Sequence, residues 1–465
     1  MQQEKDSNIK INKQVDLEFT AKDLTSWGGV SSMMAKYLDK LKFRGWVEEN
    51  IPIEDTSNNT CGKYSKIMSL FLTVLTGGEK FSHISNWMNG EEIFKKCFNV
   101  KRFSKSGSSL TRFFNKIAKQ SQSEQILIAA RKITLIIINW LKTTSVILRF
   151  DSSVIVRYGK QEGARKGYNP NKKGRFSHNP LIAFIDSGLI VNLWNRPGNS
   201  SSGGGIIEFF ENTLSSYDFK VQRIVADTGY YLVNFIEHIE GKAIKYIIGA
   251  PLCRIVQREI LNIRRWAEVA YGIEVAEFYF RHYDIKWKKE RRYVAVRQEV
   301  KKRPEATGKE ISLFPDLPES KSYRYSVMIT NEHELIPKEV WDGYKPRAND
   351  ENVIKELKDS YGFAAFSLHS FWATETVMVL IGMVLFNLMV LMKKTVINPD
   401  GTSNNQMRTL RTKHFIIPGI MGRNSKKHIF RLGIKDKSKQ LKVTQILRRI
   451  EFMPYCFYSN AVGFS

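Results

Sequence analysis

The stretch SVILRFD, residues 145–151, decides the fold, because a short apolar run typical of a buried strand ends there on an acid. The stretch RIVAD, residues 223–227, repeats this pattern and ends on a second acid, Asp227. Strand-like and helix-like segments alternate around the two runs. The region therefore predicts an α/β domain in which buried strands carry acidic side chains at their ends.

The elements expected in this region follow one another as three strands, a helix, a strand, a helix and a strand. The strands are expected at residues 145–150, 180–185, 189–194, 223–226 and 245–250, and the helices at about 206–214 and 230–239. An antiparallel meander joined to parallel crossovers is the ribonuclease H-like layout. Ligands of α/β sheets gather at the carboxyl ends of strands, so Asp151 and Asp227 converge if the first and fourth strands are neighbours.

A third acid lies in the stretch GYKPRANDENVIKELKDSYGF, residues 343–363. Tyr344, Arg347, Glu351 and Lys358 have the spacing Y-x2-R-x3-E-x6-K. On a helix, Arg347 and Glu351 are i,i+4 neighbours, and Lys358 follows Glu351 by seven positions, so all three can share one face. A carboxylate between two cations can bind a metal while its neighbours hold phosphates, although the same pattern also occurs on solvated, salt-bridged helices.

Together these motifs resemble those of the DDE transposases of bacterial insertion sequences. The resemblance rests on Asp151 after a strand, on ADTGY around Asp227 and on the four-residue signature at 344–358. The stretches QEGARKGYNPNKKGRFSHNPLIAF (161–184) and RPGN (196–199) most resemble the insertion-sequence family numbered thirteen-eighty. The resemblance covers roughly half of the chain, from about Leu148 to Leu391.

This resemblance implies a ribonuclease H-like catalytic domain interrupted by a β insertion. It implies Asp151, Asp227 and Glu351 as the catalytic residues and as ligands of two Mg²⁺ or Mn²⁺ ions per active site, a choice of metal that suits carboxylate ligands. It also implies DNA contacts from the three other signature residues, which are Tyr344, Arg347 and Lys358. We expect further DNA contacts from the basic hairpin near Asp151, through Lys172, Lys173 and Arg175.

Composition points to the same class of partner. The chain has 465 residues with 72 Lys and Arg against 46 Asp and Glu, a formal net charge of +26. Such an excess favours a polyanion, either nucleic acid or an anionic membrane. Half of it lies in residues 393–450, which carry 15 Lys and Arg against two acids. The four cysteines include no CxxC pair, which disfavours a structural zinc site or a disulfide framework.

One segment keeps the membrane alternative open. Residues 376–392, TVMVLIGMVLFNLMVLM, are almost entirely apolar and reach the lower length limit for crossing a bilayer. A lone, short span of this kind in a basic chain is more often a helix buried inside its own protein. We therefore expect a buried helix, no membrane partner and a DNA partner for the charge.

The predicted organisation has five parts. They are a helical DNA-binding or dimerisation region at 1–140, the first part of the catalytic domain at 141–250, a mainly β insertion at 251–334, the second part of the catalytic domain with the Glu helix at 335–392, and a basic C-terminal region at 393–465. Within the first part, LTRFFNKIAK (110–119) is expected to form a basic helix after an N-cap at Ser108-Ser109. Such a helix lies either in a DNA groove or on an ordinary surface.

The sequence thus favours a cut-and-paste DNA transposase of the bacterial cytoplasm, associated with the nucleoid. Its expected partner is double-stranded DNA, both the inverted-repeat ends of the transposon and the target, bound by a homodimer. Two alternatives stay open. One is a metal-dependent nuclease of the same fold that does not join strands, and the other is a DNA-binding relative with an inactive site.

Overall fold

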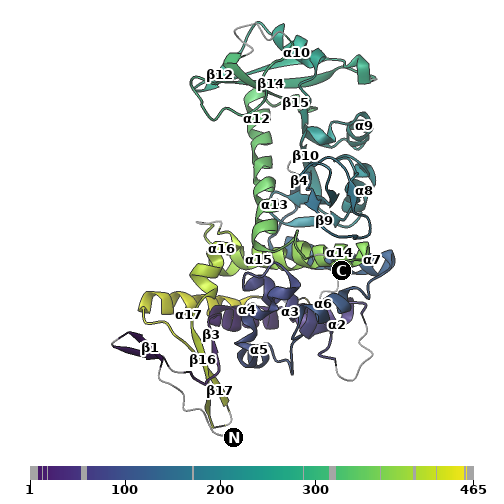
Figure 1. The fold of residues 1–465 in the computed structure, drawn as a ribbon. Coiled ribbons are helices and arrows are strands. Elements are labelled where there is room, and N and C mark those ends of the chain that lie inside the picture. The colour runs from purple at the N-terminus through teal and green to yellow at the C-terminus, as the bar shows by residue number, and fades with distance from the viewer. Residues whose placement is uncertain are drawn as a thin grey trace.

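A computed structural model describes residues 9–12, 14–17, 19–53, 60–169, 172–285, 287–313, 321–366, 368–401, 405–425, 427–454 and 457. The chain forms a mixed α/β structure with a helical lobe below and a large sheet above (Figure 1). A helical run stands beside the sheet and connects the two levels. It consists of α12 (Pro337–Tyr344), a 3-10 turn (Lys345–Arg347) and α13 (Ala348–Ser360).

Nine strands form one mixed sheet in the order β12-β13-β14-β15-β11-β10-β4-β8-β9. They are β4 Ser145–Ser152, β8 Leu181–Ile185, β9 Ile190–Trp194, β10 Lys220–Ala226, β11 Lys245–Ala250, β12 Ala267–Ala270, β13 Ile273–Phe280, β14 Arg291–Glu299 and β15 Tyr323–Thr330. β10 is parallel to both β4 and β11, and every other neighbouring pair is antiparallel. The expected order of three strands, helix, strand, helix and strand is confirmed, with α8 (Ile206–Leu214) and α9 (Val233–Gly241) as the helices.

The β-rich segment 251–334 extends this sheet instead of forming a separate one. β15 pairs with β11, and β14, β13 and β12 follow it outward to the edge. The pairing of β15 with β11 is long-range, with Thr330 opposite Ile247. No local sequence signal names a partner strand so far away, because alternation fixes which face a residue occupies but not which strand it joins.

Alternation along the central strands separates two layers of core. Phe150 of β4 packs against aromatic side chains of α8 and α9 on one face. Val225 of β10 lies in a smaller cluster with Val340 of α12 on the other. Because successive side chains of a strand point to opposite faces, Asp151 and Asp227 lie on the face that α12 and α13 cover.

The lower lobe contains most of the helices of the first 140 residues. They are α1 Ala35–Lys40, α2 Phe43–Asn50, α3 Lys63–Leu75, α4 Ser85–Met88, α5 Glu91–Cys97, α6 Gly107–Phe114 and α7 Gln120–Trp140. The basic helix α6 begins earlier than expected, since Ser106 is its N-cap and accepts a hydrogen bond from the Ser109 amide. Leu110 and Phe113 on its other face are buried.

Segments from early and late in the sequence both belong to this lower lobe. β3 (Leu24–Thr25) pairs with β16 (Gly419–Asn424), which pairs in turn with β17 (Lys427–Leu432). The C-terminal helix α17 (Lys437–Phe452) packs on α1, where Lys36 Nζ lies 3.0 Å from Glu451 Oε2. Segments that the sequence presents as an N-terminal and a C-terminal region are therefore packed against each other.

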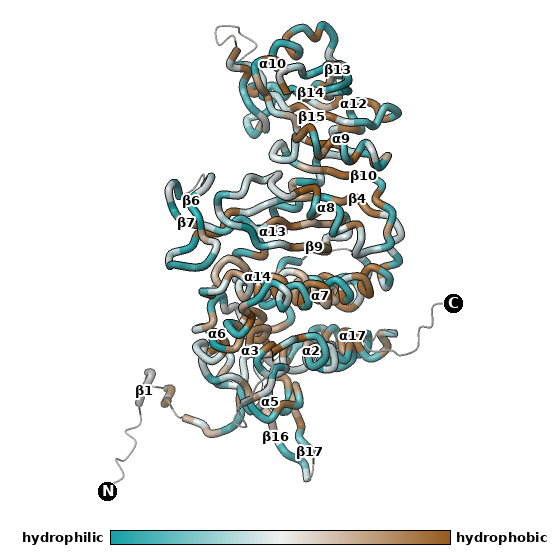
Figure 2. Tube along the Cα trace, turned by 90° about the vertical axis from the view of Figure 1, so that its right-hand side faces the viewer, coloured by the Kyte–Doolittle hydropathy of each residue, from teal (hydrophilic) through white to brown (hydrophobic). Residues whose placement is uncertain are grey.

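The apolar segment forms one helical run, Phe371–Ile397, that passes a length-and-composition test for a membrane span. Its most apolar window is wholly buried inside the protein, as expected, and Figure 2 shows it beside α7 in the hydrophobic interior. Its one buried amide is fully used. Asn387 donates to Thr134 Oγ1 (3.0 Å) and to the Ile190 carbonyl (2.8 Å), and accepts from the Ile190 amide (3.0 Å). The run thus acts as the central core element between the sheet and the helical lobe.

Candidate active site

Two carboxylates meet at the carboxyl ends of adjacent parallel strands. Ala226 of β10 lies opposite Phe150 of β4, so the next residues, Asp227 and Asp151, come side by side at the edge of the sheet. The Asp151 carboxylate accepts a hydrogen bond from the Ser152 amide (2.7 Å). The Asp227 carboxylate caps a 3-10 turn through the Gly229 amide (2.8 Å).

The positive charge that the protein places near the two carboxylates does not balance their negative charge. Burial, together with the negative charge of Asp227, raises the pKa of Asp151 from 3.8 to about 7. Burial also raises the pKa of Asp227, with a further contribution from Glu351. Arg347 opposes both shifts without cancelling them. A cation placed between these oxygens would relieve the repulsion, so the donor set suits a hard divalent ion.

The third carboxylate of the signature is close to this edge but is engaged elsewhere. Glu351 stands on the first turn of α13 and its Oε1 accepts from Arg347 Nη2 at 2.8 Å. Its side chain is 60% exposed. Within the described part of the chain, no group of three or more His, Cys, Asp or Glu side chains is arranged to hold one metal ion. The structure therefore brings Asp151 and Asp227 together and leaves Glu351 paired with its helical neighbour.

The remaining signature residues surround the acids. Lys358 Nζ donates to the Val154 carbonyl (3.2 Å). Lys358 and Asp151 also line the same two cavities. Burial lowers the pKa of Lys358, and the charge of Asp151 opposes this shift. The Tyr344 hydroxyl lies over the backbone of Gly249 on β11, where a Cβ would come within 2.7 Å of it. Two cations and a phenol thus border the acidic edge.

Arg149 and Asp350, which no sequence motif marks, fix α13 to β4. Arg149 Nε donates to both oxygens of Asp350, at 2.9 and 2.8 Å, and Arg149 Nη2 donates to the Ile185 carbonyl (3.2 Å). Both side chains are buried. Arg149 precedes Asp151 by two positions, and Asp350 directly precedes Glu351. The only signal available in the sequence was an arginine inside an apolar strand, which is costly to bury without a partner.

A cavity of about 690 Å³ opens beside Asp151 and Asp227. Its wall includes Asn179, whose Oδ1 is buried and makes no hydrogen bond to a described residue. Asn179 Nδ2 donates to the Ser200 carbonyl (2.9 Å), and this hydrogen bond orients the Oδ1 atom of the same side chain. Asn179 belongs to the quoted stretch 161–184, but nothing in its spacing marks it as a site residue.

The serine-rich loop that forms another wall is held by Arg196. Its guanidinium is buried and donates to the carbonyls of Asn179 (3.0 Å), Ser202 (3.2 Å) and Gly204 (2.6 Å). At Gly198, a Cβ would lie 2.2 Å from the Ser177 carbonyl oxygen, so only glycine fits. The RPGN motif therefore shapes the cavity instead of entering it.

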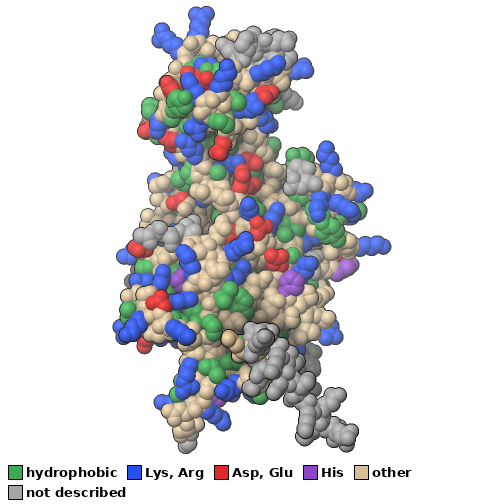
Figure 3. All heavy atoms as spheres, turned by 60° about the vertical axis from the view of Figure 1, so that its left-hand side comes forward, with side chains coloured by type: hydrophobic (Ala, Val, Ile, Leu, Met, Phe, Trp, Pro, Cys, Tyr) green, Lys and Arg blue, Asp and Glu red, His purple; other side chains and the backbone are tan. Residues whose placement is uncertain are grey.

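The basic hairpin contributes one of its three expected residues to this cavity. Lys172 lines it and also lies over the Tyr158 ring, with Nζ 5.2 Å from the centroid. Lys173 and Arg175 are exposed and are not among its lining residues. Figure 2 shows the hairpin, at β6 (Arg165–Lys166) and β7 (Phe176–His178), standing out from the body of the protein. On the face in Figure 3, acidic side chains gather near the waist, and Lys and Arg side chains spread widely around them.

Comparison with known proteins adds a family to this geometry. The family model described as transposase DDE domain group 1 matches residues 7–454. No curated protein matches the chain. Among solved structures, the cryo-EM structure of piggyBac transposase in a synaptic complex with hairpin DNA aligns with 92% of this chain and 81% of its own, at 10% identity and a TM-score of 0.41.

Proposed function

This chain belongs to the transposase DDE domain group 1 family, and from that premise we propose that it is a bacterial insertion-sequence transposase that cuts and joins DNA. The observation that carries the proposal is the pair Asp151 and Asp227, whose burial and mutual repulsion raise the pKa of Asp151 to about 7. The strand order β11-β10-β4-β8-β9 supports a ribonuclease H-like catalytic domain. The motifs at 161–184, 196–199 and 344–358 support the insertion-sequence family numbered thirteen-eighty.

In this proposal Asp151 and Asp227 hold divalent metal, and Glu351 completes the ligand set after its carboxylate leaves Arg347. When bound, two Mg²⁺ or Mn²⁺ ions supply Lewis-acid activation of the attacking oxygen and stabilise the leaving 3′-oxygen. The family membership supports a requirement for divalent metal, and carboxylates are the ligands that such hard ions prefer.

The other residues of the edge act on the DNA. Arg347, released from Glu351, offers a planar fork for a phosphate near the scissile bond, and Lys358 offers a point charge. Tyr344 packs beneath Arg347, with the guanidinium carbon 5.7 Å from its ring centroid. Lys172 is placed to hold the DNA backbone at the far wall of the cavity, and Lys173 and Arg175 extend that contact along the hairpin.

The reaction has two steps. Water attacks the phosphorus at the transposon end, the P–O3′ bond breaks, and the products are a 3′-hydroxyl and a 5′-phosphate. The 3′-hydroxyl then attacks a phosphorus of the target, a new P–O bond forms, and the target strand leaves with a free 3′-hydroxyl. Pairing two ends requires two active sites, so we propose a homodimer on DNA.

A strand-transfer assay tests the function. The substrate is a duplex with the terminal inverted repeat that flanks the gene, pre-cut to expose its 3′-hydroxyl, and the target is a supercoiled plasmid. We expect joined product with Mg²⁺ or Mn²⁺ and none with EDTA. Cleavage of uncut ends without joining of pre-cut ends would favour the nuclease alternative. DNA binding without either reaction would favour the inactive relative.

A further inference from the structure

β16 and β17 form a two-stranded ribbon whose root is firmly attached to the lower lobe. β16 pairs with β3 only through Gly419 and Ile420. Beside this contact the Gly28 amide donates to the Ile417 carbonyl (2.7 Å), and a Cβ at Gly28 would lie 2.6 Å from that oxygen. The backbones therefore approach as closely as glycine allows, and the root cannot swing freely.

The outer part of the ribbon leaves the lobe. Beyond Met421, β17 is the only strand among the described residues that pairs with β16, with Arg423 opposite His428 and Asn424 opposite Lys427. The ribbon hangs below the lower lobe in both tube and ribbon views (Figures 1 and 2). A two-stranded ribbon that projects in this way has the dimensions that the major groove of DNA admits.

The exposed side chains of the ribbon carry a single sign of charge. Arg423, Lys427 and Arg431 are exposed and form no ion pair with any residue that the structure describes. Residues 401–435 contain eight Lys and Arg and no Asp or Glu. A concentration of unpaired positive charge fits a polyanion, and it disfavours a second copy of the same ribbon.

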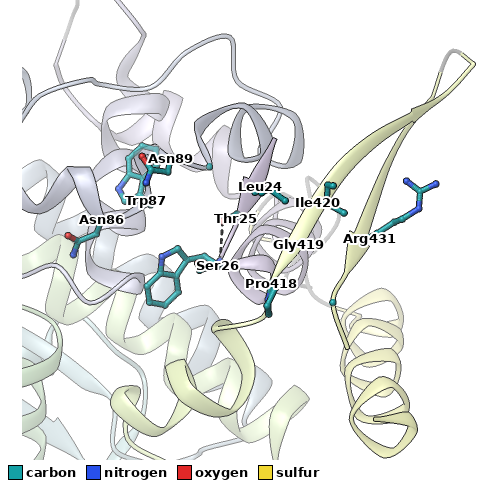
Figure 4. Close-up of a pocket in the computed structure, with 13 residues that line it drawn as sticks. Leu24, Thr25, Ser26, Asn86, Trp87, Asn89, Pro418, Gly419, Ile420 and Arg431 are labelled. Atoms are coloured by element: carbon teal, nitrogen blue, oxygen red, sulfur yellow. Dashed lines mark hydrogen bonds between the residues drawn. The ribbon is translucent and has the colours of Figure 1, made fainter. Parts of the chain in front are cut away.

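A cavity of about 540 Å³ lies at the root of the ribbon (Figure 4). One wall comes from Pro418, Gly419 and Ile420, and Arg431 extends outward from the adjoining strand. The opposite wall presents Asn86 and Asn89, both exposed, at the end of α4. None of the lining residues is acidic. Amides and a guanidinium around such an opening are donors for phosphate oxygens.

The positive field also reaches the buried base of the ribbon. His414 lies just before β16 and is buried. Burial, together with the charges of Lys442, Lys413 and Lys439, lowers its pKa from 6.5 to about 4. Cations from α17 and from the segment before the ribbon therefore surround the same place.

We propose that the β16–β17 ribbon and the cavity at its root bind double-stranded DNA at a surface separate from the carboxylate edge. The ribbon lies in the major groove, and one DNA backbone crosses the cavity between Arg431 and Asn89. The inference rests on the proposed function for the identity of the polyanion. The ribbon itself contains no acid that could take part in the chemistry.

The test compares two triple variants of the full chain, each of which loses three positive charges. The ribbon variant is R423Q/K427Q/R431Q. The control is K132Q/K142Q/K220Q, whose lysines are exposed. Lys220 begins β10, at the opposite end of that strand from Asp227. Binding of a fluorescent 40-base-pair duplex with the terminal inverted repeat is measured by anisotropy over a range of NaCl concentrations.

We expect the ribbon variant to bind the duplex at least about tenfold more weakly at 100 mM NaCl. The slope of its plot of log affinity against log salt concentration should be shallower by about 2–3, because each lost phosphate contact reduces the slope by about 0.9. The control keeps the wild-type slope. An unchanged slope in the ribbon variant, or an equal change in the control, would overturn the proposal. Circular dichroism and thermal melting establish that both variants are folded.

A footprint of the wild-type protein gives an answer that does not depend on variants. Lysine acetylation is measured by mass spectrometry with and without the duplex. Protection of Lys427 and no protection of Lys220 is the expected result, and equal acetylation of Lys427 in both samples contradicts it. If the wild-type protein cuts and joins DNA and the ribbon variant binds DNA normally, only the proposal for the ribbon is rejected. If DNA binding depends on the ribbon but the protein neither cuts nor joins DNA, only the proposed transposase function is rejected.

Discussion

Two neighbouring places in this protein bury acids in opposite ways. At the interface of β4 and α13, Asp350 receives both of its hydrogen bonds from the Arg149 guanidinium. At the open edge of the sheet, Asp151 and Asp227 lie side by side, and the positive charge of Arg347 compensates their negative charge only in part. The paired acid fixes a helix to a strand. The unpaired acids leave a negative charge for something outside the chain to neutralise.

The largest expected difference between the two places concerns chemistry. Asp151→Asn or Asp227→Asn should lower the rate of end cleavage by at least about 10³-fold, the scale on which loss of a catalytic group acts. Duplex affinity should not fall, since these groups repel phosphate. The melting temperature should not fall, because each substitution removes an unfavourable buried charge. A gel assay of cleavage, with anisotropy and thermal melting on the same samples, measures all three quantities.

Breaking the paired acid should instead affect the fold. Asp350→Asn leaves the buried Arg149 without its counter-ion and should lower the free energy of unfolding by about 3–5 kcal/mol. Urea denaturation at pH 8 measures it, a pH above the value of about 6 to which burial raises the pKa of Asp350. The double variant R149M/D350L should recover part of this loss. Equal instability of the single and double variants would contradict the role assigned to the pair.

A divalent cation should distinguish the two places in the absence of DNA. Free Mg²⁺ or Mn²⁺ at 100 times its dissociation constant should raise the free energy of unfolding by about 2.7 kcal/mol, as for any ligand of the native state alone. EDTA should reverse this gain. The gain should vanish in Asp151→Asn and persist in Asp350→Asn. A similar gain in all three proteins would place the cation elsewhere.

Glu375 provides a third and milder case, an acid that has hydrogen bonds but no ion pair to any residue that the structure describes. Its oxygens accept from Ser123 Oγ (2.9 Å) and from the Asn195 amide (2.8 Å), and burial raises its pKa from 4.5 to about 7. The folded state therefore holds this proton more tightly than the unfolded state. Stability from this group is fully present below about pH 4.5 and is lost as the pH rises to about 7.

We expect Glu375→Gln to flatten this pH dependence by on the order of 2 kcal/mol. The measurement is the free energy of unfolding of the wild type and the variant from pH 5 to pH 8. A wild-type curve that falls no faster than that of the variant over this range would remove Glu375 from the comparison.

The sequence was sufficient for the features that depend on local pattern. Apolar runs that end on acids predicted β4 and β10. The chain order predicted that Asp151 and Asp227 converge if these strands are neighbours, and β4 and β10 do pair. The all-apolar composition of residues 376–392 predicted a buried helix. For the two strands and the helix, alternation or composition within about twenty residues determines the outcome.

Features that depend on distant partners could not be predicted in this way. Thr25 pairs with Gly419, although nearly the whole sequence lies between them. The only sequence feature beside this contact is Gly28, whose lack of a side chain allows the two backbones to approach closely. The Arg149–Asp350 pair could not be predicted, because no local pattern assigns Asp350 of α13 to an arginine on a strand so far away in the sequence. The attachment of Glu351 to Arg347 is a choice between rotamers, which spacing on a helix permits but does not decide.

Mn²⁺-dependent cleavage of a transposon-end duplex should separate the two kinds of buried acid. The wild type, Asp151→Asn and Asp350→Asn are compared side by side at a temperature where all three are folded. We expect the wild type to cut at the end, Asp350→Asn to cut more slowly at the same phosphodiester, and Asp151→Asn not to cut. Cleavage by Asp151→Asn at the wild-type rate would mean that the carboxylate pair does not carry the chemistry.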